Sequence, residues 1–424
     1  MSWYFKSNLL VRILLGLILG AIAGIIFQNA TGAIAFLSPF GDLFVRLLKM
    51  IVQPVIVFTL IVGTASIAPS RLGKVGVKII LFYLLTSLFA IIVGLIFGNL
   101  IAPGAGMGIV GAEGVKSYVR EAPDLVKTLL AIVPTNPFQA YASGDVLPTI
   151  CFSIFFGIAL AFCREHTEER VRAAADVTYR FFEGAAEVIF KVVGWVMQYA
   201  PIGVFALIFV VFSKQGAEAV GPLLSTTVAV YLGLIFQLLV VYMGLLALFG
   251  LNPVRFLKKV RNPMLTAFVT RSSGGTLPVS METAEKEMGI NRGVYGFTLP
   301  LGSTINMDGT TIYLGVCAMF VANAIGVPLT GSQQLVVVLT AVLASIGTAG
   351  VPGAGAIMLV MVLDSVGLKL EAGSAVSAAY AMVLGIDAIL DMGRTSMNVV
   401  GDMTGTTIVA KTEKEMDMDV WNAN

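Results

Sequence analysis

Charged residues are scarce in this chain. Only 12% of its 424 residues are Asp, Glu, Lys or Arg, whereas soluble domains carry about 25%. Hydrophobic residues make up 57%, which leaves little room for a water-soluble domain. The net charge of +2 argues against a nucleic-acid partner. The composition therefore indicates a polytopic membrane protein.

Cysteine and histidine are scarce as well. The three cysteines, Cys151, Cys163 and Cys317, are odd in number and lie in apolar runs. We interpret them as buried thiols, and we predict neither a disulfide framework nor a zinc site. His166, the only histidine, lies among charged residues and is interpreted as a solvated loop residue. Residues 1–27 are too long for a signal peptide and lack a convincing cleavage site, so we expect a retained first span.

Long apolar runs, by contrast, are abundant. A membrane-spanning helix needs about 20 apolar residues. The fourth run is broken by Pro134 and Pro137. We therefore predict an all-α fold with eight transmembrane helices, at 9–29, 40–68, 75–102, 125–163, 176–212, 217–250, 293–326 and 373–410.

Basic residues lie in every second connection between these runs. The positive-inside rule places such connections in the cytoplasm. We therefore predict a multi-pass protein of the plasma membrane, in contact with lipid, whose two termini are both cytoplasmic. The basic residues concerned are Lys6, Arg12, Arg71, Lys74, Lys78, Arg164, Arg170, Arg172, Arg255, Lys258, Lys259 and Arg261.

Two segments of the C-terminal half fail as simple spans. Residues 262–290 lie between basic residues of the same predicted side, and residues 281–289 are too polar to span, so the segment should enter and return. Residues 333–367 form two short apolar arms around the glycine-rich stretch 345–356, which contains Pro352. One long, kinked crossing is the alternative for this second segment. Two interrupted segments that enter from opposite faces are typical of an inverted-repeat transporter with its site near the midplane.

Four ionisable side chains lie within the last apolar run. Together with one asparagine they are spaced by four, three, four and four residues, which places them on one face of a helix, with Thr395 beside them. One reading is a salt bridge between Asp391 and Arg394 that locks helix packing. The other is a binding site. The residues are Asp387, Asp391, Arg394, Asn398 and Asp402.

The binding reading specifies the ligand. The planar guanidinium of Arg394 suits bidentate pairing with a carboxylate. Asp391, one turn away, can accept hydrogen bonds from an ammonium group. Backbone amides at the tips of the interrupted segments, 272–275 and 350–353, can hold a second carboxylate. We therefore predict an acidic amino acid as the substrate.

A second polar cluster lies in the seventh run, at residues 302–313. Asn306 and Asp308 stand beside Gly309 in an otherwise apolar segment, which predicts an unwound helix with exposed carbonyls. Hard cations take such oxygen ligands. We expect cation sites built from the side chains of Asn306, Asp308 and Asp402 and the carbonyls of Gly302, Thr304 and Asn398.

Four stretches carry a family resemblance: TRSSGGTLP (270–278), NMDGT (306–310), SIGTAGVPGAG (345–355) and DMGRTSMNVVGD (391–402). They closely resemble the signatures of the dicarboxylate/amino acid:cation symporter family, specifically the archaeal and bacterial homologues of the sodium-coupled glutamate transporters. The resemblance covers essentially the whole chain. It implies a homotrimer of elevator transporters. Each protomer would have a scaffold (1–74 and 103–212) and a mobile transport domain (75–102 and 213–424), with the second hairpin as the outer gate.

The resemblance also implies site residues, with sodium as coupling ion and no organic cofactor. The substrate would contact Arg271, Ser272, Ser273, Thr310, Val351, Gly355, Asp391, Arg394, Thr395 and Asn398. One sodium would bind at Gly302, Asn306, Asn398 and Asp402. A second would use Thr304, Met307, Ser345, Ile346 and Thr348. A third would use Tyr83, Thr86, Ser87, Asn306 and Asp308.

One departure and several alternatives accompany this assignment. Relatives commonly carry three or four serines at the first tip, where this chain has Gly274. Within the family, carriers for neutral amino acids tend to lack the arginine and C4-dicarboxylate carriers tend to lack the aspartate, so the presence of both Asp391 and Arg394 implies an acidic amino acid. L-aspartate is the first expectation and L-glutamate the second. A C4-dicarboxylate or proton-coupled carrier is the alternative within the class. Asp308 and Asp391 raise the further alternative of an intramembrane aspartyl protease, against which Arg394 argues by holding Asp391 ionised.

Overall fold

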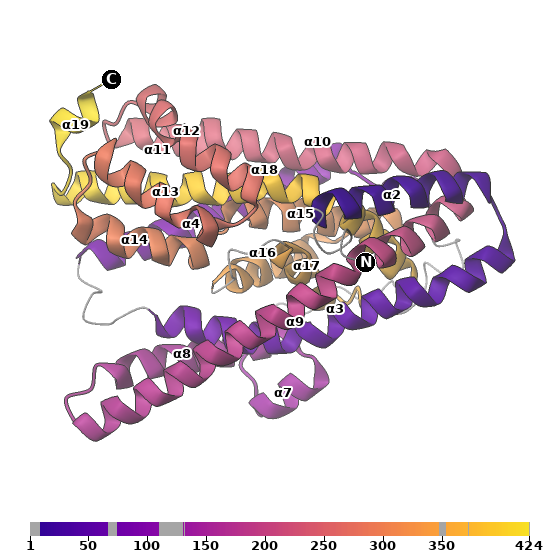
Figure 1. The fold of residues 1–424 in the computed structure, drawn as a ribbon, viewed down its shortest axis with the longest axis horizontal. Helices are drawn as coiled ribbons and strands as arrows, with labels where there is room; N and C mark the ends of the chain where they lie inside the picture. Colours follow the sequence, from indigo (N-terminus) through magenta and orange to yellow (C-terminus); the bar gives the residue numbers. More distant parts are fainter. Residues whose placement is uncertain are drawn as a thin grey trace, which may run out of the picture.

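The computed structural model describes residues 9–66, 74–109, 130, 132–346, 353–371 and 373–423, and these are almost entirely helical (Figure 1). Seven helices or helix pairs are long and apolar enough to cross a membrane, and α2 is a shorter apolar helix before them. These eight elements are α2 (Leu9–Ile26), α3 (Thr31–Ala65), α4 (Lys74–Ile101), α8 (Val146–Arg164), α9 (Glu169–Gln215), α10 (Val220–Phe236) with η3 (Gln237–Tyr242) and α11 (Met243–Leu248), α14 (Arg292–Ile305) with α15 (Asp308–Ala324), and α18 (Ala375–Glu413).

The fourth predicted span begins later than the apolar run indicated. Asn136 caps the short helix α7 (Pro137–Ser143), since its side chain accepts hydrogen bonds from the amides of Phe138 and Gln139. Gly144 ends α7 in the left-handed conformation (φ 79°), and α8 follows at once. The predicted start at residue 125 is therefore wrong, because a capped turn separates the first part of the run from the crossing helix.

The first interrupted segment is a helical hairpin. The helices α12 (Pro253–Thr270) and α13 (Ser273–Lys286) are joined by two residues only. Arg271 takes the left-handed conformation (φ 54°), and Ser272 caps α13 by accepting a hydrogen bond from the amide of Gly275. The re-entrant prediction is confirmed for this segment.

The second interrupted segment folds back as well. The helices α16 (Gly331–Ser345) and α17 (Ala354–Ser365) pack against each other, and residues 347–352 between them lie outside the described residues. Each arm is shorter than a span. A hairpin rather than one kinked crossing is therefore confirmed.

The bases of the two hairpins lie at opposite ends of α4. At one end, Lys78 contacts Thr412 and Glu413 of α18, near the base of the first hairpin. There, Lys259 of α12 donates to the carbonyls of Glu287 and Ala423. At the other end, Asn99 and Gln334 of α16 exchange side-chain hydrogen bonds. The hairpins thus enter from opposite faces, as predicted.

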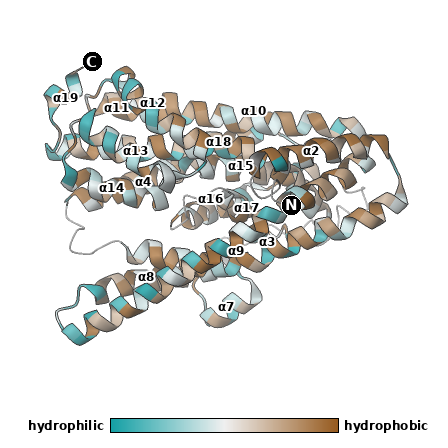
Figure 2. Cartoon of the chain, viewed as in Figure 1, coloured by the Kyte–Doolittle hydropathy of each residue, from teal (hydrophilic) through white to brown (hydrophobic). Residues whose placement is uncertain are grey.

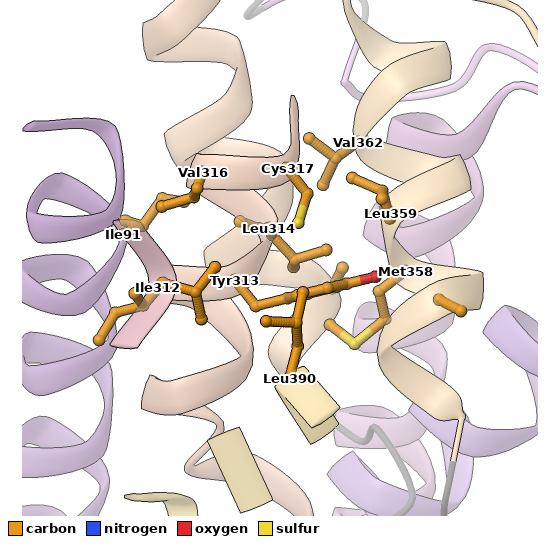
Figure 3. Packing of buried hydrophobic residues seen from close by; sticks show 14 of the residues in the cluster. Ile91, Ile312, Tyr313, Leu314, Val316, Cys317, Met358, Leu359, Val362 and Leu390 are labelled. Carbon is orange, nitrogen blue, oxygen red and sulfur yellow. The ribbon is translucent and has the colours of Figure 1, made fainter. Parts of the chain in front are cut away.

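The helices form two groups. The helices α2, α3 and α8 pack on α9, while α4, α10, α12, α14 and α15 pack around α18 (Figure 1). Helix α15 is entirely buried. Figure 3 shows it between α4, which supplies Ile91, and α17, which supplies Met358 and Leu359. The two groups meet where α18 packs on α9 and α2 and where α17 lies against α3 and α8.

Hydropathy follows this arrangement. Hydrophobic residues predominate in the long helices, and hydrophilic residues lie mainly near α19 (Met418–Asn422), near α12 and at the turn between α8 and α9 (Figure 2). Cys317 is buried as predicted, whereas Cys151 is half-buried and Cys163 is exposed. The prediction of a buried thiol is wrong for Cys163, because one face of α8 is left uncovered within a single chain. The architecture is that of a multi-pass membrane protein.

Candidate functional site

The polar stripe of α18 faces inward along its whole length. Asp387, Asp391, Arg394, Asn398 and Asp402 are each at most 6% exposed. The helical spacing read from the sequence therefore placed these residues on one buried face, as predicted. Charged groups buried at this depth require partners, and the partners define the site.

Arg394 is held by two carboxylates and a ring. Its Nη1 lies 2.7 Å from Asp387 Oδ1, and its Nε lies 3.0 Å from Asp391 Oδ1. Its guanidinium carbon lies 4.3 Å from the centre of the Tyr313 ring, a cation–π distance. Gly355 approaches so closely that a Cβ there would lie 2.6 Å from Arg394 Cζ. The protein alone therefore holds the guanidinium in place through these contacts.

Asp391 is the point where both hairpins meet α18. Its Oδ2 accepts a hydrogen bond from the amide of Gly353 at 3.3 Å and lies 3.9 Å from Arg271 Nη1. Its Oδ1 accepts one from the Thr395 hydroxyl at 3.1 Å. Two aspartates and two arginines thus balance in charge at this point, counting Asp387 and Arg394.

The first hairpin tip brings its serines to the same region. Ser272 caps α13, so its hydroxyl is engaged at the helix N-terminus. Ser273 is 3% exposed, and its hydroxyl has no hydrogen-bond partner among the described residues. A buried hydroxyl of this kind is suited to a ligand group.

Of the predicted substrate residues, Val351 lies outside the described residues. The structure adds Asp387 and Tyr313, which the sequence analysis did not assign to the substrate site. Asp387 belongs to the same stripe, and Tyr313 stands one helical turn after Thr310, so spacing alone gave a signal for both.

The predicted break in the seventh span is present. Helix α14 ends at Ile305, Asn306 and Met307 leave the helical conformation (ψ 95° and 45°), and α15 begins at Asp308. The free amides of Gly309 and Thr310 at the start of α15 donate to Asn398 Oδ1 at 2.8 and 3.3 Å. The Asn398 side chain thus accepts hydrogen bonds from first-turn amides of α15 that have no partner within the helix.

The first predicted cation group is assembled at this break. Asn306 Nδ2 donates to Asp402 Oδ1 at 3.0 Å and to the carbonyl of Asn398 at 3.3 Å. Gly302 lies so near that a Cβ there would be 2.5 Å from Asp402 Oδ1. All four residues of this group therefore converge.

The second predicted group is only partly assembled. The hydroxyls of Thr304 and Ser345 each donate to a carbonyl of their own helix, Leu301 and Val342 respectively. Neither hydroxyl bonds across to the other element within the described part of the chain. Met307 Sδ lies 3.1 Å from Asn398 Nδ2. Ile346 ends α16 in extended backbone, and Thr348 lies outside the described residues.

The third predicted group surrounds Asp308. Ser87 donates to Asp308 Oδ1 at 2.7 Å, and the Thr86 hydroxyl lies 3.4 Å from Asn306 Oδ1. The Tyr83 hydroxyl donates instead to the carbonyl of Thr298 at 2.9 Å. Two further residues of this cluster, Gln237 and Tyr242, were not predicted, because they lie singly in an apolar run far from the motifs.

Comparisons with known proteins show the family of this chain. The family model of the sodium:dicarboxylate symporter family matches residues 9–412. The chain is 37% identical over 416 residues to the proton/sodium-glutamate symport protein of Bacillus caldotenax, which covers 96% of this chain and 95% of the relative. It is 34% identical over 429 residues to the proton/glutamate-aspartate symporter of Escherichia coli (strain K12), and this alignment covers 97% of this chain and 94% of the relative. It is 32% identical over 418 residues to the C4-dicarboxylate transport protein of Bacillus subtilis (strain 168), and this alignment covers 97% of this chain and 95% of the relative.

Proposed function

The chain belongs to the sodium:dicarboxylate symporter family, and we propose that it imports an acidic amino acid, L-aspartate first and L-glutamate second, together with sodium ions. It is a multi-pass membrane transporter of an acidic substrate and not an enzyme, so the protease alternative is dismissed. The names of its relatives divide between glutamate, aspartate and C4-dicarboxylates and between protons and sodium. The choice among these rests on the site.

The observation that carries the amino-acid proposal is the pair of Asp391 and Arg394, 3.0 Å apart and buried. The substrate's side-chain carboxylate would pair with Arg394, and its ammonium group would bind Asp391. The α-carboxylate would take the hairpin tips, where the amides at the start of α13 and the Ser273 hydroxyl are available. A C4-dicarboxylate has no ammonium group, and the Asp391 carboxylate would repel its second carboxylate.

The coupling ion follows from the chemistry of the ligand groups. The residues around the helix break offer carboxylate, amide, hydroxyl and carbonyl oxygens, which are ligands for a hard cation. Asp402 and Asp308 each lie within 3.0 Å of a partner from another helix, Asn306 and Ser87 respectively. Sodium rather than a proton is therefore the proposed ion, held at up to three positions.

The two helix groups support an elevator mechanism. The group around α9 would be the scaffold (1–74 and 103–212), and the group around α18 would be the transport domain (75–102 and 213–424). Both hairpins belong to the second group, so substrate and ions would move with it. The homotrimer, the plasma-membrane location and the cytoplasmic termini rest on the family resemblance and on the basic residues of alternate connections.

Uptake into proteoliposomes tests the function. Labelled L-aspartate is offered with an inward gradient of sodium, lithium or protons, each imposed separately, and with unlabelled succinate as competitor. We expect concentrative uptake with sodium alone and little competition by succinate. Uptake driven by protons without sodium, or full competition by succinate, would favour the proton-coupled or C4-dicarboxylate alternative.

A further inference from the structure

A buried polar cluster lies where η3, the segment that follows α10, passes the break between α14 and α15. Asp308 Oδ2 accepts hydrogen bonds from the Tyr242 hydroxyl at 2.7 Å and from Gln237 Nε2 at 3.3 Å. Asp308, Gln237 and Tyr242 are all 0% exposed. These two partners, which follow α10 in η3, thus contact the one carboxylate oxygen that Ser87 leaves free.

A local change of helix type brings these two partners together. Gln237 and Tyr242 are the first and last residues of the π-helical segment η3. Residues five apart on an α-helix point about 140° away from each other, because each residue adds about 100°. The i→i+5 pattern of a π-helix returns them to nearly the same face, and such segments are frequent at functional sites.

The amide of Gln237 is only half satisfied. Its Nε2 donates to Asp308 Oδ2 and lies 3.5 Å from the carbonyl oxygen of Thr86. Its Oε1 is buried and has no hydrogen-bond partner among the described residues. Buried amide oxygens are almost always paired, so an unpaired one points to a ligand.

We propose that Gln237 is a further oxygen ligand of the cation bound at Asp308, and that Tyr242 positions the Asp308 carboxylate. The inference rests on the proposed sodium coupling. The amide NH₂ contacts the Asp308 and Thr86 oxygens, and a cation between these oxygens would take its place. A half turn about the last side-chain bond would exchange Nε2 and Oε1, so Oε1 would face the same oxygens and would serve as a further ligand.

Sodium titration of aspartate binding tests this inference. Purified full-length protein carrying Gln237→Met is compared with wild type by calorimetry in sodium and in lithium. We expect the sodium concentration for half-maximal aspartate binding to rise at least fivefold, and the ratio of the lithium and sodium midpoints to change at least threefold. Gln334→Met, which removes an amide that bonds Asn99 far from the cluster, is the matched control and should stay within twofold.

Tyr242→Phe separates positioning from ligation. It should raise the sodium midpoint without changing the ratio of the lithium and sodium midpoints, because no cation ligand is lost. A sodium midpoint and ratio within twofold of wild type for Gln237→Met would overturn the ligand role. A lower melting temperature with unchanged sodium dependence would overturn it equally, since it would mark a purely structural residue.

The sodium dependence of wild-type aspartate binding distinguishes a failure of the proposed sodium coupling from a failure of the Gln237 ligand role alone. If wild-type aspartate binding does not depend on sodium, the proposed coupling fails together with this inference, whereas a sodium-dependent wild type with an insensitive Gln237→Met overturns this inference alone. If Gln237→Met does not fold, the ligand role of Gln237 is tested instead by isotope-edited infrared spectra of the wild-type protein with labelled glutamine. Sodium added without aspartate should shift one side-chain carbonyl band, and no shift overturns the ligand role.

Discussion

Replacing Arg394 by alanine tests the centre of the site. The guanidinium is the group proposed to pair with the substrate's side-chain carboxylate, and it is buried with Asp387 2.7 Å away and Asp391 3.0 Å away. Truncating one partner of a buried, hydrogen-bonded charge pair costs about 2–5 kcal/mol in binding. At about 1.4 kcal/mol per tenfold, aspartate affinity should fall by about 30-fold to about 4000-fold.

The fold responds to the same change and requires a control. Arg394→Ala leaves Asp387 and Asp391 buried without their main counter-charge, and breaking a buried pair destabilises by about 3–5 kcal/mol. The double variant Asp387→Ala/Arg394→Ala removes one negative and one positive charge together, so it should restore much of the thermal stability. It should not restore aspartate affinity, because the partner of the substrate carboxylate is still missing.

Calorimetry of aspartate and of a neutral amino acid of similar size, both at saturating sodium, measures the effect. The neutral ligand should lose far less affinity than aspartate, since it places no carboxylate at Arg394. If either variant binds aspartate within threefold of wild type, the assignment of Arg394 to the side-chain carboxylate is refuted.

Three other predictions address the ions and the hairpins. Asp402→Asn removes a full charge from the predicted cation group that contains Asn306. Aspartate binding should therefore require at least fivefold more sodium, while maximal binding is retained. An unchanged sodium titration would show that Asp402 is not a sodium ligand. Gly355→Ala would place a Cβ 2.6 Å from the carbon of the Arg394 guanidinium and should lower aspartate affinity at least tenfold in an equilibrium binding assay. The control Gly331→Ala adds its Cβ in open space and should leave aspartate affinity unchanged. A fluorophore on Ala354→Cys should report a mobile second hairpin without ligands and a closed one with sodium and aspartate together, and full closure by aspartate in sodium-free buffer would separate the gate from the coupling.

The sequence was most informative where local pattern determines structure. The length of the apolar runs predicted the long helices, and the four-three-four-four spacing predicted that the α18 stripe is buried on one face. Gly309 and the polar residues before it predicted the break at Asn306. The start of α8 was not predictable from hydropathy, because the Asn136 cap, not composition, separates α7 from the crossing helix.

Contacts between distant elements were beyond the sequence. Spacing placed Asp387 on the same helix face as Arg394, but it did not show that the Tyr313 ring of α15 packs on the Arg394 guanidinium. Gln237 and Tyr242 were missed completely, since a single polar residue in an apolar run is compatible with many environments. Their role depends on a π-helical segment that hydropathy does not reveal.

One residue links the two halves of the site. The side chain of Asn398 holds the start of α15 through the amides of Gly309 and Thr310, and its backbone carbonyl accepts from Asn306, which also bonds Asp402. Asn398 lies one turn beyond Arg394 on the same helix face. On the proposed assignment, a cation that engages Asn306 and Asp402 would therefore order the helix turn that presents the proposed substrate residues. Because linkage is reciprocal, substrate must raise sodium affinity by the same factor by which sodium raises substrate affinity.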